Sequence, residues 1–206
     1  LSIDARTKGK IKVGKYGYHI EKIDQQDQFS QEKVQELLEN YDDETMILTG
    51  YNSTRIKIND FIRNHKFFEP TEEPMVGDKV ICLRNNHAKH IYNGMVGIIK
   101  HIEPIDEDAY YAEINLEDVE YKGDIYKHQF RAEKPTNFVR GKRSKVRGLD
   151  LFDFGYALTV HKAQGSQAKR VILFEERFKK MDDDQWRRWL YTGITRAEKE
   201  LYIIGK

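Results

Sequence analysis

Several polar side chains that can bind oxyanions follow one apolar run near the end of the chain. The segment 159–167 supplies a hydroxyl, an imidazole, an ammonium and two amides, from Thr159, His161, Lys162, Gln164 and Gln167. These groups can hydrogen-bond phosphate and sugar oxygens, and α/β sheets bind ligands at loops beyond the carboxyl ends of their strands. Gly165 permits a tight turn within the segment. The sequence therefore predicts a ligand-binding loop at the end of a strand.

A second segment, 190–197, places an arginine at the edge of an apolar helix face. Within this segment and just before it, small and apolar residues recur at the helical period. They are Trp186, Trp189, Leu190, Gly193, Ile194 and Ala197. On this wheel Arg196 lies about 90° from the centre of the apolar face. Its guanidinium could reach a domain boundary and stabilise charge on a transferring phosphoryl group, as an arginine finger does. The alternative for an arginine at such an edge is a surface ion pair.

The segment from Gly9 to Tyr16 imitates a phosphate-binding loop but lacks its chemistry. GKIKVGKY satisfies the first seven positions of the pattern G-x-x-x-x-G-K-[ST]. Tyr16 stands where a Ser or Thr hydroxyl would hold Mg²⁺, and the β-branched Ile11 and Val13 stand where backbone N–H groups would wrap around phosphate. No strand-like run precedes the segment. We therefore predict that it does not bind nucleotide phosphates.

Two further patterns bear on metal binding. The run 171–176, VILFEE, imitates an apolar strand that ends in metal-binding acids. Without a true phosphate loop before it, we interpret this run as a core strand with exposed acids at its end. Cys82 is the single cysteine, which excludes an internal disulfide and a cysteine-built zinc site. We expect no metal site in this chain and a buried Cys82.

Both ends of the chain have the pattern of an α/β layer. The expected elements are a helix over 31–40, a strand over 45–49, a helix across 58–65, strands over 156–160 and 171–174, a helix over 183–195 and a strand over 201–204. Ser30 is the expected N-cap of the first helix.

The middle of the chain has short β-rich runs, which are typical of small barrels. The expected strands are 79–84, 95–102, 110–116 and 124–129. Asn93-Gly94 is a strong turn sequence. The basic stretch 140–147, RGKRSKVR, is either a solvated linker or a strip that contacts phosphates.

The composition predicts a soluble globular protein. Of the 206 residues, 39% are hydrophobic, which is enough for a sizeable core. The 35 Lys and Arg balance 34 Asp and Glu, so the overall charge does not show whether the partner is a polyanion, and only local clusters of charge could. No apolar run is long enough for a membrane span, and we expect a cytoplasmic protein without a membrane partner. Because Leu1 is not an initiator Met, we expect the chain to be part of a longer protein.

TVHKAQGSQ, followed about thirty residues later by LYTGITRA, resembles the fifth and sixth signature motifs of superfamily one DNA helicases, particularly the RecD/Dda branch. GDKVICLRNN and YNGMVGII are similar to the SH3-like insertion of those enzymes, and ILTGYNSTRIKINDFIR resembles the strand and helix before it. The resemblance implies an α/β fold. A RecA-like second motor domain of the P-loop NTPase type, residues 1–73 and 148–206, would be interrupted by an SH3-like β-barrel, residues 74–147.

The resemblance also implies roles for individual residues. Arg196 would be the arginine finger acting on the γ-phosphate of ATP, and Gln167 and Gly165 would lie on the nucleotide side. Gln167 departs from relatives that have Glu at this position, because an amide brings no negative charge. Gln164 would link the ATP and DNA sites. The residues implied in single-stranded DNA binding are Thr159, His161 and Lys162 in the loop and Arg143 in the basic stretch.

The sequence thus predicts part of an ATP-dependent helicase that moves 5′ to 3′, a direction implied by the resemblance alone. ATP and Mg²⁺ would be held by a first motor domain upstream of Leu1, so the isolated chain should hold no cofactor and hydrolyse no ATP. A rival interpretation is a stand-alone module, in which the barrel and the strip around Arg143 recruit nucleic acid or a protein partner. A nuclease has little support, because no compact cluster of acids with a lysine can be placed on one sheet edge.

Overall fold

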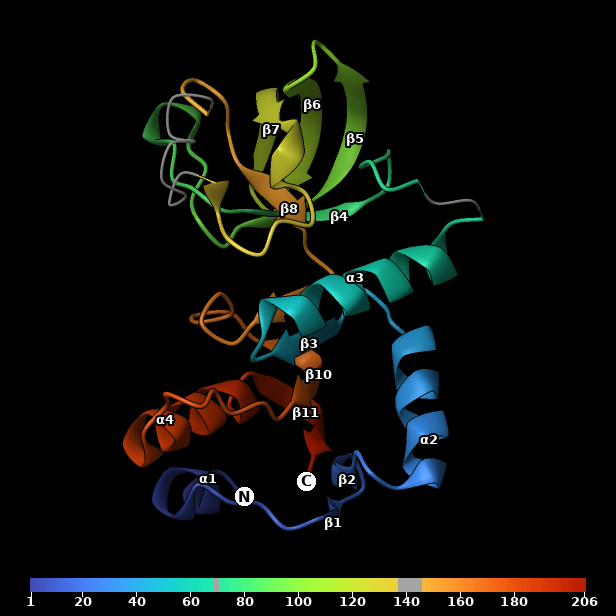
Figure 1. Ribbon diagram of the computed structural model, residues 1–206, viewed down its shortest axis with the longest axis vertical. Coiled ribbons are helices and arrows are strands. Elements are labelled where there is room, and N and C mark those ends of the chain that lie inside the picture. Colours follow the sequence, from blue (N-terminus) through green and yellow to red (C-terminus); the bar gives the residue numbers. More distant parts are fainter. Residues whose placement is uncertain (69–70, 137–145) are drawn as a thin grey trace. The chain divides into compact units, whose positions relative to one another are not determined.

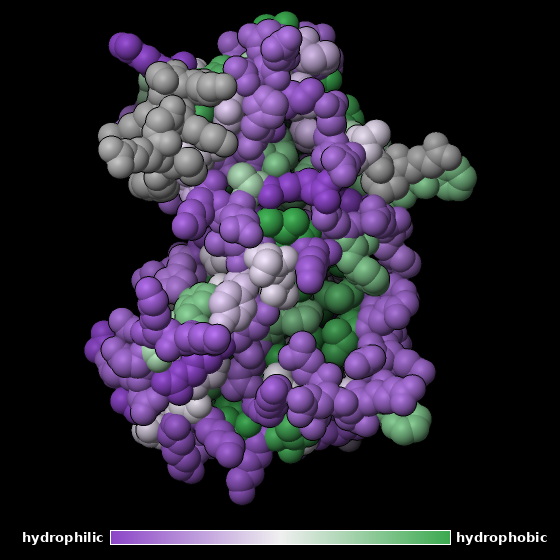
Figure 2. Space-filling view, viewed as in Figure 1, coloured by the Kyte–Doolittle hydropathy of each residue, from purple (hydrophilic) through white to green (hydrophobic). Residues whose placement is uncertain are grey.

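Two units make up the chain in the computed structural model, which describes residues 1–68, 71–136 and 146–206 (Figure 1). The first unit comprises Leu1–Ile58 and Ala157–Lys206, and the second comprises Asn59–Tyr156. Each unit has its own β-sheet, so the predicted α/β class is confirmed. No helix in the described ranges is both long and apolar enough to cross a bilayer. Hydrophilic side chains cover most of the face drawn in Figure 2, as expected where 33% of residues are charged.

A six-stranded sheet, in the order β1-β2-β11-β10-β3-β9, forms the centre of the first unit. Its strands are β1 (Gly14–Gly17), β2 (Ile20–Asp24), β3 (Thr45–Thr49), β9 (Ala157–Thr159), β10 (Ala168–Phe174) and β11 (Ala197–Gly205). All neighbouring strands are parallel except the β1–β2 hairpin. Parallel strands are usually covered on both faces, which explains the continuous apolar runs of β3 and β10.

Helices cover this sheet on both faces. They are α1 (Ser2–Lys8), α2 (Gln28–Glu39) and α4 (Asp183–Ile194), while α3 (Asn52–Lys66) follows β3. The connections through α2 and α4 run in opposite directions along the strand order, and right-handed crossovers then place the two helices on opposite faces. Figure 1 shows this arrangement. The capping box of Asp182 and Gln185 sets the start of α4, and the predicted helix over 183–195 is confirmed to within one residue.

The start of α2 was predicted incorrectly. The helix begins at Gln28, and Asp27 is its N-cap rather than Ser30. The Asp27 carboxylate accepts hydrogen bonds from the Ser30 amide at 3.1 Å and from its hydroxyl at 2.9 Å. Asp and Ser are both good caps, and here the earlier residue satisfies the free amide of the first turn.

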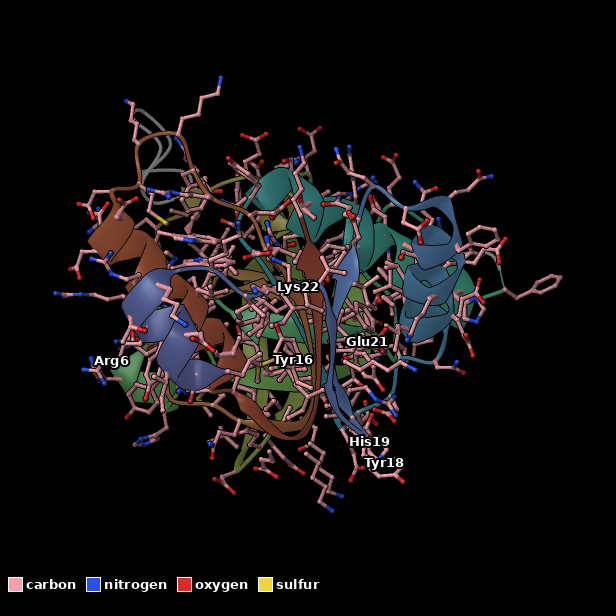
Figure 3. All side chains as sticks on the ribbon, turned by 90° about the horizontal axis from the view of Figure 1, so that it is seen from below. Arg6, Tyr16, Tyr18, His19, Glu21 and Lys22 are labelled. Carbon is pink, nitrogen blue, oxygen red and sulfur yellow. The ribbon has the colours of Figure 1, made fainter. Side chains whose placement is uncertain are left out.

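The glycines of the imitation phosphate loop have structural roles. Gly9 ends α1 in the left-handed conformation, with φ of 62°, and its carbonyl accepts the Trp186 indole N–H at 2.7 Å. Gly14 then begins the edge strand β1. A phosphate loop joins a strand to the helix that follows it, whereas this segment joins a helix to a strand. Figure 3 shows α1 beside α4, with Tyr16 and Tyr18 on and after β1.

Gly9→Ala should destabilise the protein by about 1–2 kcal/mol because a left-handed residue with a Cβ is strained. The added carbon would also lie 3.0 Å from Cγ of Arg187 and 3.1 Å from Cδ1 of Trp186. Gly17→Ala is the matched control, since its Cβ would meet no atom within 4 Å. Urea unfolding of both variants measures the difference. An equal effect of the two changes would contradict the capping role of Gly9.

The second unit contains a five-stranded antiparallel sheet in the order β7-β6-β5-β4-β8. Its strands are β4 (Lys79–Cys82), β5 (Val96–Pro104), β6 (Ala109–Leu116), β7 (Val119–Tyr126) and β8 (Phe152–Phe154), with 3₁₀ turns η1 (His87–Lys89) and η2 (Lys127–Gln129). Four of these strands overlap the predicted ones, but β7 starts earlier than expected and residues 127–129 form η2 instead of strand. The pairing of β7 with β6 along their full lengths decides that start. Cys82 is buried, as expected.

A buried ion pair lies beside the core of the second unit. The Arg63 guanidinium donates to both carboxylate oxygens of Asp78, at 2.8 and 2.9 Å, and both side chains are almost completely buried. Asp78 also accepts the Tyr156 hydroxyl at 2.9 Å and the Met75 amide at 2.9 Å. The guanidinium lies 4.0 Å from the centre of the Phe154 ring. Every polar group of the pair therefore has a partner, as a buried charge requires.

Buried tyrosines should make the protein sensitive to alkali. Burial, reinforced by Asp150 and Asp78 respectively, raises the pKa of Tyr121 and of Tyr156 well above the usual value for a phenol. These phenols stay neutral in the folded chain while those of the unfolded chain ionise, so stability is complete below about pH 10 and falls as the pH rises further. Urea unfolding between about pH 8 and pH 11 should show this loss. A constant unfolding midpoint across that range would contradict it.

Candidate functional site

The loop that follows β9 is a series of tight turns anchored by two buried residues. The Val160 amide donates to the Thr49 carbonyl at 3.2 Å, which ties the start of the loop to β3. Val160 and Ala163 are buried, whereas His161 and Gln164 are exposed. Backbone hydrogen bonds from residues 162, 163 and 166 to carbonyls three or four positions earlier fold the loop. Gly165 is exposed and has φ of 95°, the left-handed geometry expected of a turn glycine.

Arg196 lies just beyond the end of α4 and is held by the last turn of that helix and by the loop. Because α4 ends at Ile194, the helical wheel does not set the position of Arg196. Its Nε donates to the Thr192 carbonyl at 3.0 Å, one Nη to the Ser166 carbonyl at 3.1 Å and the other to the Thr195 hydroxyl at 3.2 Å. No carboxylate in the described part of the chain forms an ion pair with it. The arrangement therefore differs from the surface ion pair considered as the alternative.

The loop runs from one end of the parallel strands to the other. Thr159 pairs with Thr49 at the carboxyl ends of parallel strands β9 and β3. Ala168 pairs with Ala197 at the amino ends of β10 and β11, where the Ala168 amide donates to the Arg196 carbonyl at 3.0 Å. Residues 160–167 thus connect the end of the sheet that carries Thr159 with the end that carries Arg196.

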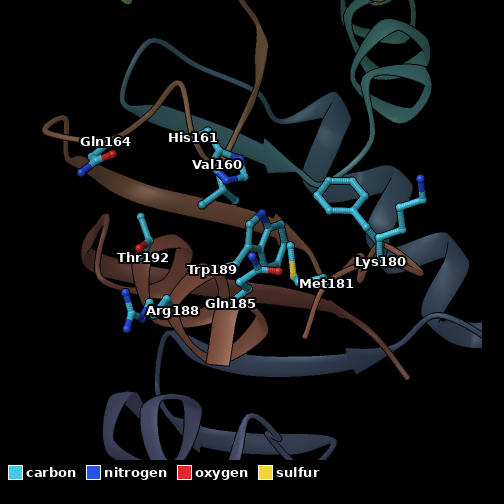
Figure 4. Close-up of a pocket in the computed structure, with 10 residues that line it drawn as sticks. Val160, His161, Gln164, Lys180, Met181, Gln185, Arg188, Trp189 and Thr192 are labelled. Atoms are coloured by element: carbon cyan, nitrogen blue, oxygen red, sulfur yellow. The ribbon is translucent and has the colours of Figure 1, made fainter. Parts of the chain in front are cut away.

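A pocket of about 490 Å³ lies between this loop, α4 and the segment before α4 (Figure 4). The residues that line it are Val160, His161, Gln164, Phe178, Lys180, Met181, Gln185, Arg188, Trp189 and Thr192. Of the predicted site residues, His161 and Gln164 meet in this pocket. Those outside its lining are Thr159, Lys162, Gly165, Gln167 and Arg196, and Arg143 lies outside the described residues.

Most of the pocket lining was not predicted as functional. Trp189 was assigned to the apolar face of α4, where it also lies, being 4% exposed. Phe178, Lys180 and Met181 belong to the irregular segment between β10 and α4, which has no periodic pattern. The one sign of this pocket in the sequence was a cluster of aromatic and basic residues, Arg177 to Lys180, between a strand and a helix.

The acids at the end of β10 are not exposed, which corrects the expectation. Glu175 pairs with the buried Lys22, and its side chain is 10% exposed. Glu176 accepts the amides of Gly50 and Tyr51 at 2.8 and 2.9 Å and the Thr54 hydroxyl at 2.5 Å, so it caps the start of α3. Within the described residues no cluster of three or more His, Cys, Asp or Glu side chains could hold a metal ion.

Comparisons with known proteins relate this part of the chain to a helicase family. Residues 154–204, which contain both the loop and Arg196, match the family model described as the UvrD-like helicase C-terminal domain. This part of the chain is thus similar to the C-terminal domain of superfamily one helicases. The RecD subunit of the RecBCD enzyme from Buchnera aphidicola subsp. Schizaphis graminum is 27% identical over 70% of the chain and 20% of that protein.

Two further proteins are similar to the chain. The ATP-dependent RecD2 DNA helicase of Deinococcus radiodurans is 27% identical over 65% of the chain and 15% of that protein. A solved structure of two coordinating Pif1 helicases, which concerns DNA unwinding at forked double-stranded DNA, is also similar. It matches with a TM-score of 0.50 and 16% identity over 83% of this chain and 42% of the Pif1 chain. This last likeness supports the fold alone. The chain spans only 10–20% of the curated relatives it matches.

Proposed function

We propose that the chain is the second motor domain of an ATP-dependent DNA helicase that moves 5′ to 3′ along single-stranded DNA. The matched family model and the RecD relatives support a DNA helicase. The first motor domain would lie elsewhere in the same protein and supply the phosphate loop and the Mg²⁺ ligands. The present chain would contribute the arginine finger and part of the grip on the strand.

One contact carries this proposal: the guanidinium of Arg196 donates to the Ser166 carbonyl in the loop at 3.1 Å. All three acceptors of this guanidinium are uncharged, so a γ-phosphate could replace them as a stronger, charged acceptor. Movement of Arg196 toward ATP would then release Ser166 and shift the loop. ATP binding at one end of the strands would thereby change the DNA contacts at the other end.

The remaining residues of the loop divide by position. Thr159, His161 and Lys162 lie at the carboxyl end of β9 and would contact the DNA backbone, with Arg143 as a further contact. Gln167 and Gly165 lie toward Arg196 and would belong to the nucleotide side. Gln164, between the two groups, would couple them.

Residues 74–147 are proposed to form an SH3-like barrel inserted into a RecA-like domain of residues 1–73 and 148–206. Four of the five strands in the antiparallel sheet of the second unit, β4 to β7, lie within residues 74–147 and support the barrel. The mainly parallel sheet of the first unit supports the RecA-like part. A barrel of this kind could also bind a protein partner.

Single-strand binding by the 206-residue chain tests the DNA contacts. Each phosphate contact contributes roughly 0.7 to the slope of log affinity against log salt for a single strand. Lys162→Gln should therefore weaken binding and lower this slope by about one contact, whereas Lys199→Gln, an exposed lysine on β11, should not. The chain alone should not hydrolyse ATP. Turnover that disappears in Lys15→Ala would contradict the proposal and favour a phosphate loop at Gly9.

A further inference from the structure

The indole N–H of Trp189 is a buried hydrogen-bond donor in the described part of the chain. Trp189 is 4% exposed, and no acceptor among the residues the structure describes bonds to its Nε1. Trp186, which stacks on Trp189 with ring centres 5.2 Å apart, donates its own N–H to the Gly9 carbonyl. Folded proteins seldom leave a buried donor unpaired, because it loses its hydrogen bonds to water and gains none in return. An acceptor from outside the chain would satisfy Trp189.

The pocket places this donor among groups that suit a flat, polar ring. Val160, Phe178 and Met181 give the pocket apolar and aromatic walls, and Trp189 contributes its indole. Figure 4 shows the indole nitrogen on the side of Trp189 that faces Val160 and His161. Two cations, Lys180 and Arg188, also line the pocket, and no acidic residue does. A ligand here should thus combine an aromatic ring, an acceptor atom and negative charge.

We propose that this pocket holds one unpaired base of a single-stranded DNA. The base would lie against the aromatic walls and accept the Trp189 N–H, and Lys180 and Arg188 would contact the flanking phosphates. The inference rests on the proposed function, because it adds a base site to the strand that the loop would contact.

Other classes of ligand fit the pocket less well. A free phosphate would leave the apolar walls uncovered, and an apolar molecule would leave the Trp189 donor unpaired. A cation would meet Lys180 and Arg188, and Asp184, which pairs with Arg188 at 2.8 Å, does not line the pocket. Every DNA base has a hydrogen-bond acceptor on its edge and a face that stacks on aromatic side chains. The pocket therefore requires a base but does not select among the four.

The pocket can be tested by measuring two proteins against two DNA strands. Fluorescence anisotropy gives the affinity of the 206-residue chain and of its Trp189→Phe variant for a thymidine oligonucleotide and for an abasic one of the same length. Phenylalanine keeps an aromatic ring but has no N–H. The variant should bind the thymidine strand roughly fivefold more weakly, as for one lost hydrogen bond, and the abasic strand as well as before.

Lys180→Gln is a second variant, at an exposed residue whose replacement should not affect folding. It should weaken binding of both strands and lower the salt slope, and the neighbouring exposed Lys179, which does not line the pocket, gives the matched control Lys179→Gln. Equal weakening of both strands by Trp189→Phe, or identical wild-type affinity for both strands, would overturn the base site but leave the strand contacts in place. Absence of any single-strand binding would instead overturn the proposed function.

Discussion

Replacing Arg196 by alanine should lower ATP hydrolysis by the complete protein by about 10³-fold or more if Arg196 is the proposed arginine finger. Arg196→Lys should be nearly as severe. A lysine keeps the charge but lacks the planar fork, and the fork is what lets one side chain reach the Thr192, Ser166 and Thr195 acceptors together. The loss should fall on kcat, because a finger stabilises charge that develops in the transition state.

Steady-state ATPase assays of the complete helicase with saturating single-stranded DNA measure this effect. Lys199→Ala, which removes an exposed cation three residues away, should leave kcat unchanged. The KM for ATP separates a finger from a merely structural arginine. If Arg196 is a finger, Arg196→Ala should leave this KM almost unchanged, whereas a change in KM would indicate a structural role. A wild-type kcat in Arg196→Ala would show that Arg196 has no catalytic role.

The elements that were predicted well are those whose local pattern agrees with their final environment. The strand over residues 45–49 was predicted at its observed bounds, since a buried parallel strand is apolar throughout and glycine follows it. The helix before Arg196 has both a capping box and an apolar face. Short antiparallel strands were located less well, because cross-strand pairing decides where each one ends.

The candidate site was predictable as a set of residues but not as a geometry. The loop and Arg196 are distinctive in sequence, yet the contact between Arg196 and Ser166 depends on the parallel pairing of β10 with β11. The acids after β10 appeared to be exposed because their partners are distant in the chain. Lys22 meets Glu175, and the start of α3 meets Glu176, only once the sheet has formed. The pocket beside Trp189 likewise could not be predicted, because the segments that line it are distant in the chain and meet only in the folded protein.

Asp78→Ala should destabilise the second unit by about 3–5 kcal/mol, because removal of one partner leaves a charge buried without compensation. Arg63 is 2% exposed and could not regain water without disturbing the Phe154 ring beneath it. The change also removes the acceptor of the Tyr156 hydroxyl. Tyr156→Phe alone removes the hydrogen bonds that the hydroxyl donates to Asp78 and accepts from the Lys79 amide, but it leaves the ion pair intact, so it should cost less, about 1–3 kcal/mol.

Asp60→Ala is the matched control, because Asp60 forms its ion pair with Arg131 where both side chains are about one third exposed. Such a pair contributes about 0–1 kcal/mol, so urea unfolding should separate the two aspartates clearly. The double variant Arg63→Met with Asp78→Leu should be more stable than Asp78→Ala, since neither charge remains buried. Equal losses for Asp78→Ala and Asp60→Ala would show that Arg63 finds water or another partner. In that case, the Arg63–Asp78 ion pair would not hold the end of α3 against the start of β4.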